Sequence, residues 1–360
     1  MEFKKIAILR ANALGDFVFT LPALYALRER FPDAEIVFLV KRLYKNFLSQ
    51  RSLPIDRVMV VPPYPGVGEA EDFEPDQEEV DQFFRKMEKE KFDLAIQIHG
   101  GGRNSNPFLK RLGAKVTLGL KTPDAEPLDI SVPYVYYQNE ILRLLEVVKE
   151  VGAQTKNLEP KLEVVDEDLR EAAEVLNGVG ELKKVVLHPG ASDLRRHWPA
   201  EKFAKVGDHF AAKGYAVCVT GTSQEKDLVE KVVNNMEQKA ENLCGKLTIS
   251  GLIGLLSKAS LVISNDTGPL HLARSIGVPA VGIYWCGNLI NAGPMTRKFM
   301  RPLVSWQTHC PLCGQDIASD YAFDKRKQND CKHEASFVAP IEVEGVTQAG
   351  EEMLSLRCAL

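Results

Sequence analysis

The sequence of 360 residues contains no run of about 18 apolar residues, which is the length that a membrane-spanning helix requires. Its first apolar run follows Lys4 and Lys5 but stops at Arg10, short of the roughly 7 to 15 residues of a secretory signal. An excess of one charge sign is also missing, because 45 basic and 49 acidic residues leave a formal net charge of −4. We therefore expect a cytoplasmic protein that binds no nucleic acid and associates with a membrane at most peripherally.

Cysteine is too scarce for a disulfide scaffold, and the seven cysteines are odd in number, which argues against complete pairing. Four of them lie in apolar or helical text, as buried thiols do: Cys218, Cys244, Cys286 and Cys358. The other three lie between residues 309 and 333, near a histidine.

This cysteine-rich segment has the spacing of a metal site. Cys310 and Cys313 have the two-residue spacer of a metal knuckle, and Cys331 and His333 follow 18 and 20 positions after Cys313. Three cysteines and one histidine form a tetrahedral ligand set, so we predict a structural zinc or iron.

Two alternatives to this ligand set stay open. The step from Cys331 to His333 is short, so His309 or Cys358 is an alternative fourth ligand. The alternative to any metal is a set of reduced thiols, or one disulfide, in a cytoplasmic loop.

Short apolar runs alternate with helix-like segments along the whole chain. The runs are KIAILRA, EIVFLV, DRVMVV and FDLAIQIH in the first half, and KKVVLHPG, YAVCVTG, SLVISND and PAVGIYW in the second. This alternation is typical of βαβ units on parallel sheets that helices cover on both faces. We predict an α/β protein with two Rossmann-like domains and an active site in the cleft between them.

A polar stretch over residues 151–184 separates the two halves. We place the boundary near its middle, with one domain over 1–165 and a second over 166–338 that includes the cysteine-rich segment. The segment 61–79 is rich in proline, glycine and acidic residues, and we interpret it as a surface loop, with a substrate lid as the alternative.

The first strand–helix loop, RANALGDFVFTLP, lacks the glycine pattern of a nucleotide-binding turn. Gly15 can make the turn there, and Asp16 can cap the helix by accepting from free backbone amides. An aspartate at the carboxyl end of a strand is also where a general base would lie. The residues alone leave both interpretations open.

The loop LHPGASDLRRHWPAEKF places a small-residue turn, with Ser192, before two arginines. Pro199 can open the helix that follows, and guanidinium groups at this point would be aimed at a phosphate. We predict that Arg196 points inward, while Arg195 can be solvated and Trp198 packs.

The loop LVISNDTGPLHLARSIG leads an apolar strand into Asp266, Thr267 and Gly268, with His271 one turn inside the next helix. Amides at Thr267 and Gly268, together with the positive helix end, would form a diphosphate cradle without a P-loop lysine. Taken singly, Asp266 can be a cap and His271 a core histidine. Together on one turn they indicate a site.

The sequence has no convincing DxD metal motif, because Asp166 and Asp168 read as the start of a helix. On the acceptor side, LAIQIHGGGRNSNPF places His99, Arg103 and Asn104 after a first-domain strand. A glycine-rich loop with polar tips suits a sugar or phosphate of an acceptor, and a bare turn is an equal alternative.

Three stretches together resemble the ADP-heptose glycosyltransferases, the heptosyltransferase family of lipopolysaccharide core assembly. They are LGDFVFTLPAL, HPGAS followed by RRHWP, and NLCGKLTISGLIGLLSKASLVISNDTGPLHLARSIGVP. The resemblance covers nearly the whole chain up to about residue 290, and NDTGPLHLA is its most specific motif. It implies a GT-B architecture with an acceptor-binding N-terminal domain, a nucleotide-sugar-binding C-terminal domain, and a C-terminal helix over 339–360 that returns to the first domain.

The resemblance also implies roles for individual residues. It puts the family's catalytic aspartate on Asp16 and its donor-phosphate cation on Arg196, where the family often has lysine. Its donor-contacting residues fall on Asp266, Thr267, Gly268 and His271. Inverting transfer in this family is usually metal-independent, so the resemblance implies no catalytic cofactor, although related autotransporter heptosyltransferases carry an iron-binding cysteine finger.

We therefore predict an inverting glycosyltransferase that moves heptose from an ADP-sugar, ADP-heptose, to a hydroxyl of a glycan or lipid-linked acceptor such as lipopolysaccharide core. Any membrane association would be peripheral to the inner membrane. A sugar-nucleotide epimerase or hydrolase of the same architecture is one alternative, but it would need more acid–base groups than His271 in the donor pocket. A non-catalytic sugar-nucleotide-binding relative is another, but it need not keep Asp16 beside an intact NDTG motif.

Overall fold

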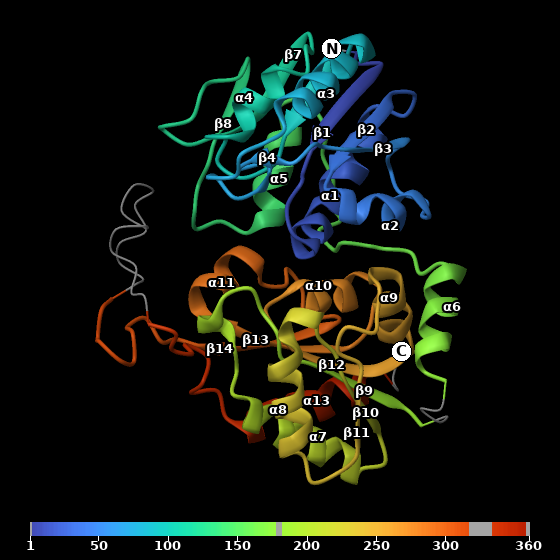
Figure 1. The fold of residues 1–360 in the computed structure, drawn as a ribbon, viewed down its shortest axis with the longest axis vertical. Helices are drawn as coiled ribbons and strands as arrows, with labels where there is room; N and C mark the ends of the chain where they lie inside the picture. The colour runs from blue at the N-terminus through green and yellow to red at the C-terminus, as the bar shows by residue number, and fades with distance from the viewer. Residues whose placement is uncertain (1, 178–181, 317–332, 358–360) are drawn as a thin grey trace. The chain divides into compact units, whose positions relative to one another are not determined.

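The computed structural model describes residues 2–177, 182–316 and 333–357. The chain divides into two compact units, Met1–Pro160 and Lys161–Leu360, and each unit has its own sheet (Figure 1). Within the described ranges, none of the helices combines the length and the apolar character that crossing a membrane requires.

Unit 1 contains a six-stranded sheet in which all neighbouring strands run parallel, in the order β3-β2-β1-β6-β7-β8. Its strands are β1 (Lys5–Leu9), β2 (Glu35–Val40), β3 (Arg57–Val60), β6 (Leu94–Gln97), β7 (Val116–Lys121) and β8 (Ile130–Pro133). The strand order reverses between β1 and β6, and such a switch point is where open α/β sheets bind ligands. Two short strands, β4 (Tyr64–Pro65) and β5 (Gly68–Glu69), lie in the segment expected to be a surface loop.

Helices cover both faces of this sheet. They are α1 (Leu14–Arg30), α2 (Lys45–Ser49), α3 (Gln77–Glu90), α4 (Ser105–Lys110) and α5 (Glu140–Lys149), with a 3₁₀ turn, η1 (Arg42–Tyr44). Ala7 and Leu9 of β1 share a core with Phe84 of α3. On the opposite face Phe38 of β2 contacts Phe17 of α1, with ring centroids 6.2 Å apart, because side chains alternate along a strand.

Unit 2 repeats this topology with the order β11-β10-β9-β12-β13-β14, again parallel throughout. Its strands are β9 (Lys184–His188), β10 (Ala216–Val219), β11 (Ala240–Asn242), β12 (Ala259–Asn265), β13 (Ala280–Trp285) and β14 (Met300–Ser305). The switch point of this sheet therefore lies between β9 and β12.

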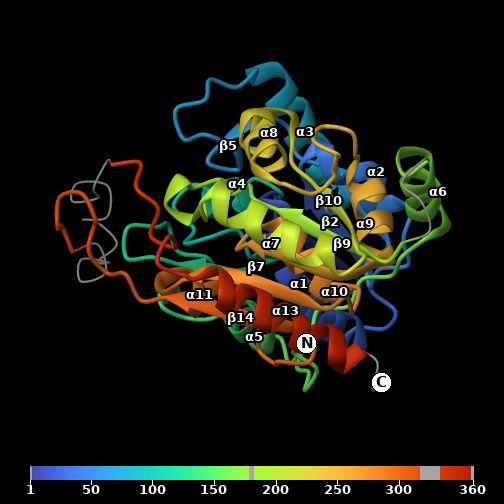
Figure 2. The same cartoon turned by 90° about the horizontal axis from the view of Figure 1, so that it is seen from below.

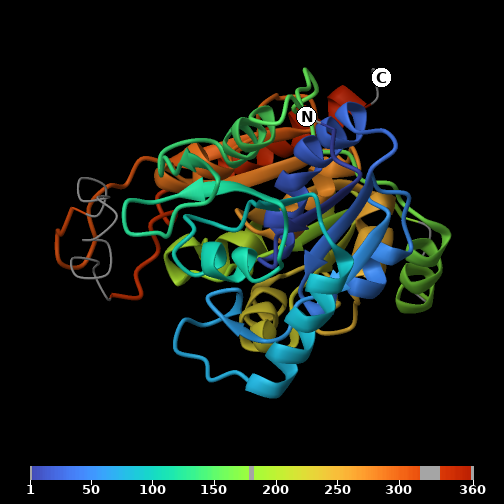
Figure 3. The same cartoon turned by 90° about the horizontal axis from the view of Figure 1, so that it is seen from above.

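The helices of unit 2 again form two layers. They are α6 (Asp166–Val175), α7 (Ala200–Ala212), α8 (Lys226–Asn235), α9 (Ile249–Lys258), α10 (Gly268–Ser275), α11 (Cys286–Ala292) and α13 (Val343–Arg357), with the 3₁₀ turns η2 (Leu194–Arg196) and η3 (Ser223–Glu225). In Figure 1, α7, α8 and α13 lie on one side of the sheet and α9 and α10 on the other, and Figure 3 shows the same ribbon from above.

The C-terminal helix α13 packs on the sheet of unit 2, beside α7 and β14 (Figure 2). Val346, Ala349 and Met353 are buried in the same core as Phe210 of α7. The resemblance implied a helix that returns to the first domain, but the apolar face of α13 is buried within unit 2.

The first residues of unit 2 also join its own core. Leu162 donates its backbone N–H to the carbonyl oxygen of Ser275 at 3.0 Å, so the division falls at residue 160, where the sequence suggested 165. Helix α6 begins at Asp166, and Asp168 accepts from the backbone N–H of Val165 at 3.0 Å, which confirms the helix-start interpretation.

Candidate active site

Two loops meet at the switch point of unit 1, one after β1 and one after β6. His99 lies in the loop after β6 and joins it to the loop after β1, because its Nδ1 accepts from the backbone N–H of Ala11 at 3.0 Å. Its Nε2 lies 3.2 Å from the carbonyl oxygen of Gly66, in the turn between β4 and β5. Burial, together with the nearby charge of Arg10, lowers the pKa of His99 to about 3. The neutral ring therefore donates from Nε2, and both of its nitrogens hold the loops in place.

Asp16 lies in the first turn of α1, and its carboxylate accepts two hydrogen bonds. Oδ2 accepts from the backbone N–H of Ala13 at 3.0 Å, as a helix-capping residue does. Oδ1 accepts from Nη2 of Arg10 at 2.9 Å, which capping does not require. The side chain is still 32% exposed, so the arrangement leaves an oriented carboxylate within reach of a substrate.

Sequence reasoning missed the role of Arg10, whose side chain is only 1% exposed. Its Nη2 also donates to Glu140 at 2.8 Å, and its Nη1 contacts the carbonyl oxygen of Ile98. A charge directly after the apolar run IAIL was the one available signal. Nothing in the sequence marks Glu140, which lies 130 positions away.

The predicted acceptor residues Arg103 and Asn104 lie on the glycine-rich loop after β6. Arg103 is exposed, and its Nε lies 3.8 Å from Asp124 Oδ2. Asn104 packs on Gly66, where φ is +66° and an added Cβ would lie 2.1 Å from Asn104 Nδ2, so only glycine fits. Asn106 is buried instead, and it accepts from Gln97 Nε2 at 2.8 Å.

In unit 2, Arg196 spans the switch point between the loops after β9 and β12. Its Nη1 donates to the carbonyl oxygen of Asp266 at 3.0 Å and lies 3.5 Å from the Asp266 carboxylate. Its Nη2 donates to Ser192 Oγ at 2.7 Å. Arg195 pairs with nearby Asp193 at 2.7 Å, so the contacts favour Arg196 as the inward arginine.

Asp266 is buried at the start of α10 and does not cap it. Its Oδ1 accepts from His271 Nε2 at 3.0 Å, and its backbone N–H donates to Ile283. Thr267 occupies the N-cap position of α10 and makes no side-chain capping bond. The first amides of the helix, at Thr267 and Gly268, therefore keep the anion-binding capacity that a helix start provides.

Two neighbouring residues fix the Arg196 loop. Trp198 is fully buried, packs on Phe203 and donates from Nε1 to the carbonyl oxygen of Ile341 at 2.9 Å, so the packing interpretation is confirmed. Asn265, which sequence reasoning did not single out, accepts from the backbone N–H of Trp198 at 3.2 Å and donates to the carbonyl oxygen of Pro189 at 2.6 Å.

The cysteine-rich segment brings three predicted ligands together. Side-chain ligand atoms of Cys310, Cys313 and His333 all lie within 4.8 Å of one another. Gly314 donates its N–H to the carbonyl oxygen of Cys310 at 2.9 Å, which closes the tight turn that the two-residue spacer predicts. The predicted ligand Cys331 lies outside the described residues, as does the alternative ligand Cys358.

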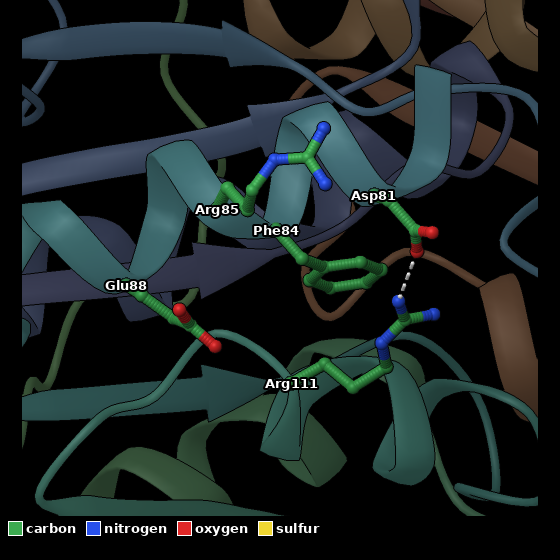
Figure 4. Close-up of a pocket in the computed structure, with 5 residues that line it drawn as sticks. All are labelled: Asp81, Phe84, Arg85, Glu88 and Arg111. Atoms are coloured by element: carbon green, nitrogen blue, oxygen red, sulfur yellow. Dashed lines mark hydrogen bonds and ion pairs between the residues drawn. The ribbon is translucent and has the colours of Figure 1, made fainter. Parts of the chain in front are cut away.

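A separate pocket of about 200 Å³ lies on the outer helices of unit 1 (Figure 4). Arg111 fills part of it by pairing with Asp81 at 3.0 Å and stacking 3.9 Å from the ring centroid of Phe84. Its lining residues come from α3 and the end of α4, away from the Asp16 loop in sequence, and we assign no role in the reaction to it.

Two Rossmann-like units, each with polar side chains at its switch point, are the architecture of GT-B glycosyltransferases. The chain belongs to glycosyltransferase family 9 (heptosyltransferase), whose sequence profile matches residues 80–313. It is therefore a glycosyltransferase, and this membership does not favour the epimerase, hydrolase or non-catalytic alternatives.

Individual proteins agree with this assignment. The lipopolysaccharide core heptosyltransferase OpsX of Haemophilus influenzae is 22% identical over 298 residues, which cover 81% of this chain and 82% of OpsX. The glycosyl transferase family 9 structure from Veillonella parvula matches with a TM-score of 0.80 and 22% identity, and covers 98% of both chains. The E. coli ADP-heptose lps heptosyltransferase II structure matches with a TM-score of 0.74 and 15% identity, over 98% of this chain and 99% of that chain. These structures confirm the predicted GT-B fold.

Proposed function

We propose that the protein transfers heptose from ADP-heptose to a hydroxyl group of a lipopolysaccharide core acceptor, with inversion at the anomeric carbon. The names of the relatives support this donor and this acceptor, since OpsX is a lipopolysaccharide core heptosyltransferase and the E. coli neighbour is an ADP-heptose lps heptosyltransferase. Unit 2 would bind the donor and unit 1 the acceptor.

The contact of Arg196 with Asp266 is the observation that carries the proposal. It places a guanidinium and a serine hydroxyl beside the start of α10, where helix amides also attract negative charge. A leaving diphosphate needs this combination, because its negative charge increases as the bond to the sugar breaks. Asp266 and His271 would hold Arg196 and contact the sugar.

Asp16 would act as the general base. It takes the proton from the acceptor hydroxyl, whose oxygen forms the new bond to the anomeric carbon while the bond from that carbon to the diphosphate oxygen breaks. ADP leaves with the electron pair of the broken bond. Arg196 and the amides of Thr267 and Gly268 stabilise the charge, so the step requires no metal or cofactor.

Arg103 and Asn104 would contact the acceptor, since both are on the glycine-rich loop that His99 ties to the loop before Asp16. His99 would contribute by holding this loop, because both of its ring nitrogens already have partners. A lipid-linked acceptor would bring the protein to the inner-membrane surface, which would make its membrane association peripheral.

The test is an assay of ADP release and product mass with ADP-heptose and a heptose-free core acceptor. Asp16→Asn should still bind ADP but lose transfer by about 10²–10⁴-fold, the usual contribution of a general base. Near-normal turnover in Asp16→Asn would reduce Asp16 to a helix cap. Consumption of ADP-heptose without acceptor, with release of free or epimerised sugar, would favour the hydrolase or epimerase alternative.

We also propose a structural zinc or iron at Cys310, Cys313 and His333, with Cys331 as fourth ligand. The donor set fits, because two thiolates and an imidazole are ligands that zinc prefers. Cys310 Sγ lies 3.8 Å from His333 Nδ1, close to the separation of about 3.8 Å between ligands of a tetrahedral site with bonds of about 2.3 Å.

Elemental analysis of protein purified without a nickel column tests this site. About one equivalent of zinc or iron should be present, and Cys313→Ser should lose it together with local protease resistance. Cys244→Ser is the matched control, because Cys244 lies in the loop after β11, outside the cluster, and its thiol donates to the carbonyl oxygen of Thr222. Metal-free protein that is folded and active would contradict the proposal.

A further inference from the structure

We propose that Arg10 is a positioning residue for the catalytic carboxylate and that Glu140 and Arg143 hold Arg10 in place. The inference rests on the proposed role of Asp16 as general base. It adds three residues to the reaction that neither the motifs nor the family resemblance identified.

The four side chains form one alternating chain of charges. Nη2 of Arg10 has two N–H bonds, and it donates to Asp16 Oδ1 at 2.9 Å and to Glu140 Oε1 at 2.8 Å. Nη1 of Arg10 contacts the carbonyl oxygen of Ile98 at the end of β6. Because a guanidinium is a rigid planar fork, these three acceptors fix where its edge faces Asp16.

A second arginine fixes Glu140 from the other side. Arg143 contacts Glu140 Oε2, and its Nη2 donates to the carbonyl oxygens of Val135, Tyr136 and Gln138 at 2.7, 2.8 and 3.1 Å. These carbonyls belong to the loop between β8 and α5. The position of Asp16 thus depends on residues from three strand ends of the sheet.

Stability alone is a poor reason to keep this arrangement. The Arg10 side chain is 1% exposed, and its Nε is buried with no hydrogen-bond partner among the described residues. Burying ion pairs gains little over apolar side chains of similar size, and an unsatisfied buried donor is unfavourable. The arrangement does make sense at a reacting carboxylate, because Glu140 still balances the charge of Arg10 when Asp16 accepts the acceptor's proton.

The experiment compares Arg10→Met, Arg10→Lys, Glu140→Gln and the Arg10→Met/Glu140→Gln double variant. Each is measured for kcat, for KM of donor and acceptor, for ADP affinity by calorimetry and for thermal unfolding. Arg111→Met is the matched control, because Arg111 is also an arginine of unit 1 that pairs with one carboxylate and an aromatic ring, at the outer pocket (Figure 4).

Arg10→Met should lower kcat by about 10²-fold, the loss that follows a misplacement of about 1 Å, with ADP affinity unchanged. Arg10→Lys should recover only a small part of the lost kcat, since lysine returns the charge without the planar fork that reaches all three acceptors. Glu140→Gln should lower kcat less than Arg10→Met does. The double variant should be no worse than Arg10→Met, because Glu140 acts through Arg10.

Three results would overturn the inference. The first is a folded Arg10→Met with wild-type kcat. The second is a loss of kcat in Arg10→Met that equals the fraction of unfolded protein in the sample. The third is a loss of kcat in the double variant that equals the sum of the two single-variant losses in free energy. If Arg10→Met does not fold, Arg10→Lys and Glu140→Gln decide, and wild-type kcat in both would overturn it equally. Asp16→Asn in the same assay separates the two proposals. If Asp16→Asn is inactive while Arg10→Met keeps wild-type kcat, the proposal that Asp16 is the general base stands and only the positioning role of Arg10 is rejected.

Discussion

Nη1 of Arg196 lies 3.0 Å from the carbonyl oxygen of Asp266, although the two residues are 70 positions apart in the chain. The contact joins the loops after β9 and β12, which are neighbouring strands on either side of the switch point. Asn265 makes a second link there by donating to the carbonyl oxygen of Pro189. A cation and a helix start are therefore held at one place by backbone geometry.

Arg196→Ala should weaken ADP binding and slow transfer. The leaving diphosphate would lose a charge-assisted hydrogen bond, usually about 1.5–3 kcal/mol. Calorimetric ADP titration and steady-state kinetics measure both effects. Arg195→Ala is the matched control and should keep ADP affinity, because Arg195 pairs with Asp193. If Arg195→Ala loses ADP affinity and transfer while Arg196→Ala does not, Arg195 and not Arg196 is the donor-phosphate cation.

His271→Leu should destabilise the fold and weaken donor binding together. It removes the Nε2 donor from the buried Asp266 carboxylate, and leaving such a group unsatisfied costs about 1–3 kcal/mol or more. His271→Gln keeps an N–H donor and should lose less. His209→Leu, at an exposed pair with Glu351, should change stability by less than about 1 kcal/mol. Urea unfolding measures these stabilities. If His271→Leu has the same free energy of unfolding as the wild type, Asp266 does not need His271 as a hydrogen-bond partner.

Stability should fall on acidification because of His188, at the end of β9. Burial lowers the pKa of His188 from 6.5 to about 4, and Nδ1 lies 3.0 Å from Thr220 Oγ1. Between pH 6.5 and about 4 the unfolded chain binds a proton that the native chain does not, so the free energy of unfolding decreases as pH falls. The slope from this residue is at most about 1.4 kcal/mol per pH unit.

Urea unfolding at several pH values between 7 and 5 measures this dependence. In His188→Asn the slope should be shallower than in the wild type, and the remainder should come partly from His99, whose pKa is also lowered by burial. An identical slope in both proteins would remove His188 from the explanation.

Gly254→Ala should destabilise unit 2 by about 1–3 kcal/mol, as overpacking does. An added Cβ would lie 1.9 Å from the carbonyl oxygen of Asp168, where α9 crosses α6. Gly345→Ala is the control, because a Cβ there meets nothing within 4 Å and alanine favours the helix α13. Equal melting temperatures of the two variants would show that α6 can shift at no cost.

Local sequence signals predicted the fold class and the loops of the site. Buried strands such as β1, β2, β9 and β12 each contain a run of consecutive apolar residues (IAIL, IVFLV, VVL and LVI), because both faces of the sheet are covered. The edge strands β8, β11 and β14 were not predicted, since their residues are more exposed and carry a weaker apolar signal. The interior strand β7 was also missed, because Thr117 and Gly119 interrupt its apolar run VTLGLK.

The sequence by itself determined two α/β units, the loop after β1 with Asp16, and the loops that carry Arg196 and Asp266, since these follow from local periodicity and short motifs. Only the tertiary structure decided that Arg10 joins Asp16 to Glu140 and that His99 holds two loops. It also decided that α13 packs in unit 2. The physical reason is that a hydrogen bond between residues 130 positions apart depends on strand order, and strand order leaves no local pattern in the chain.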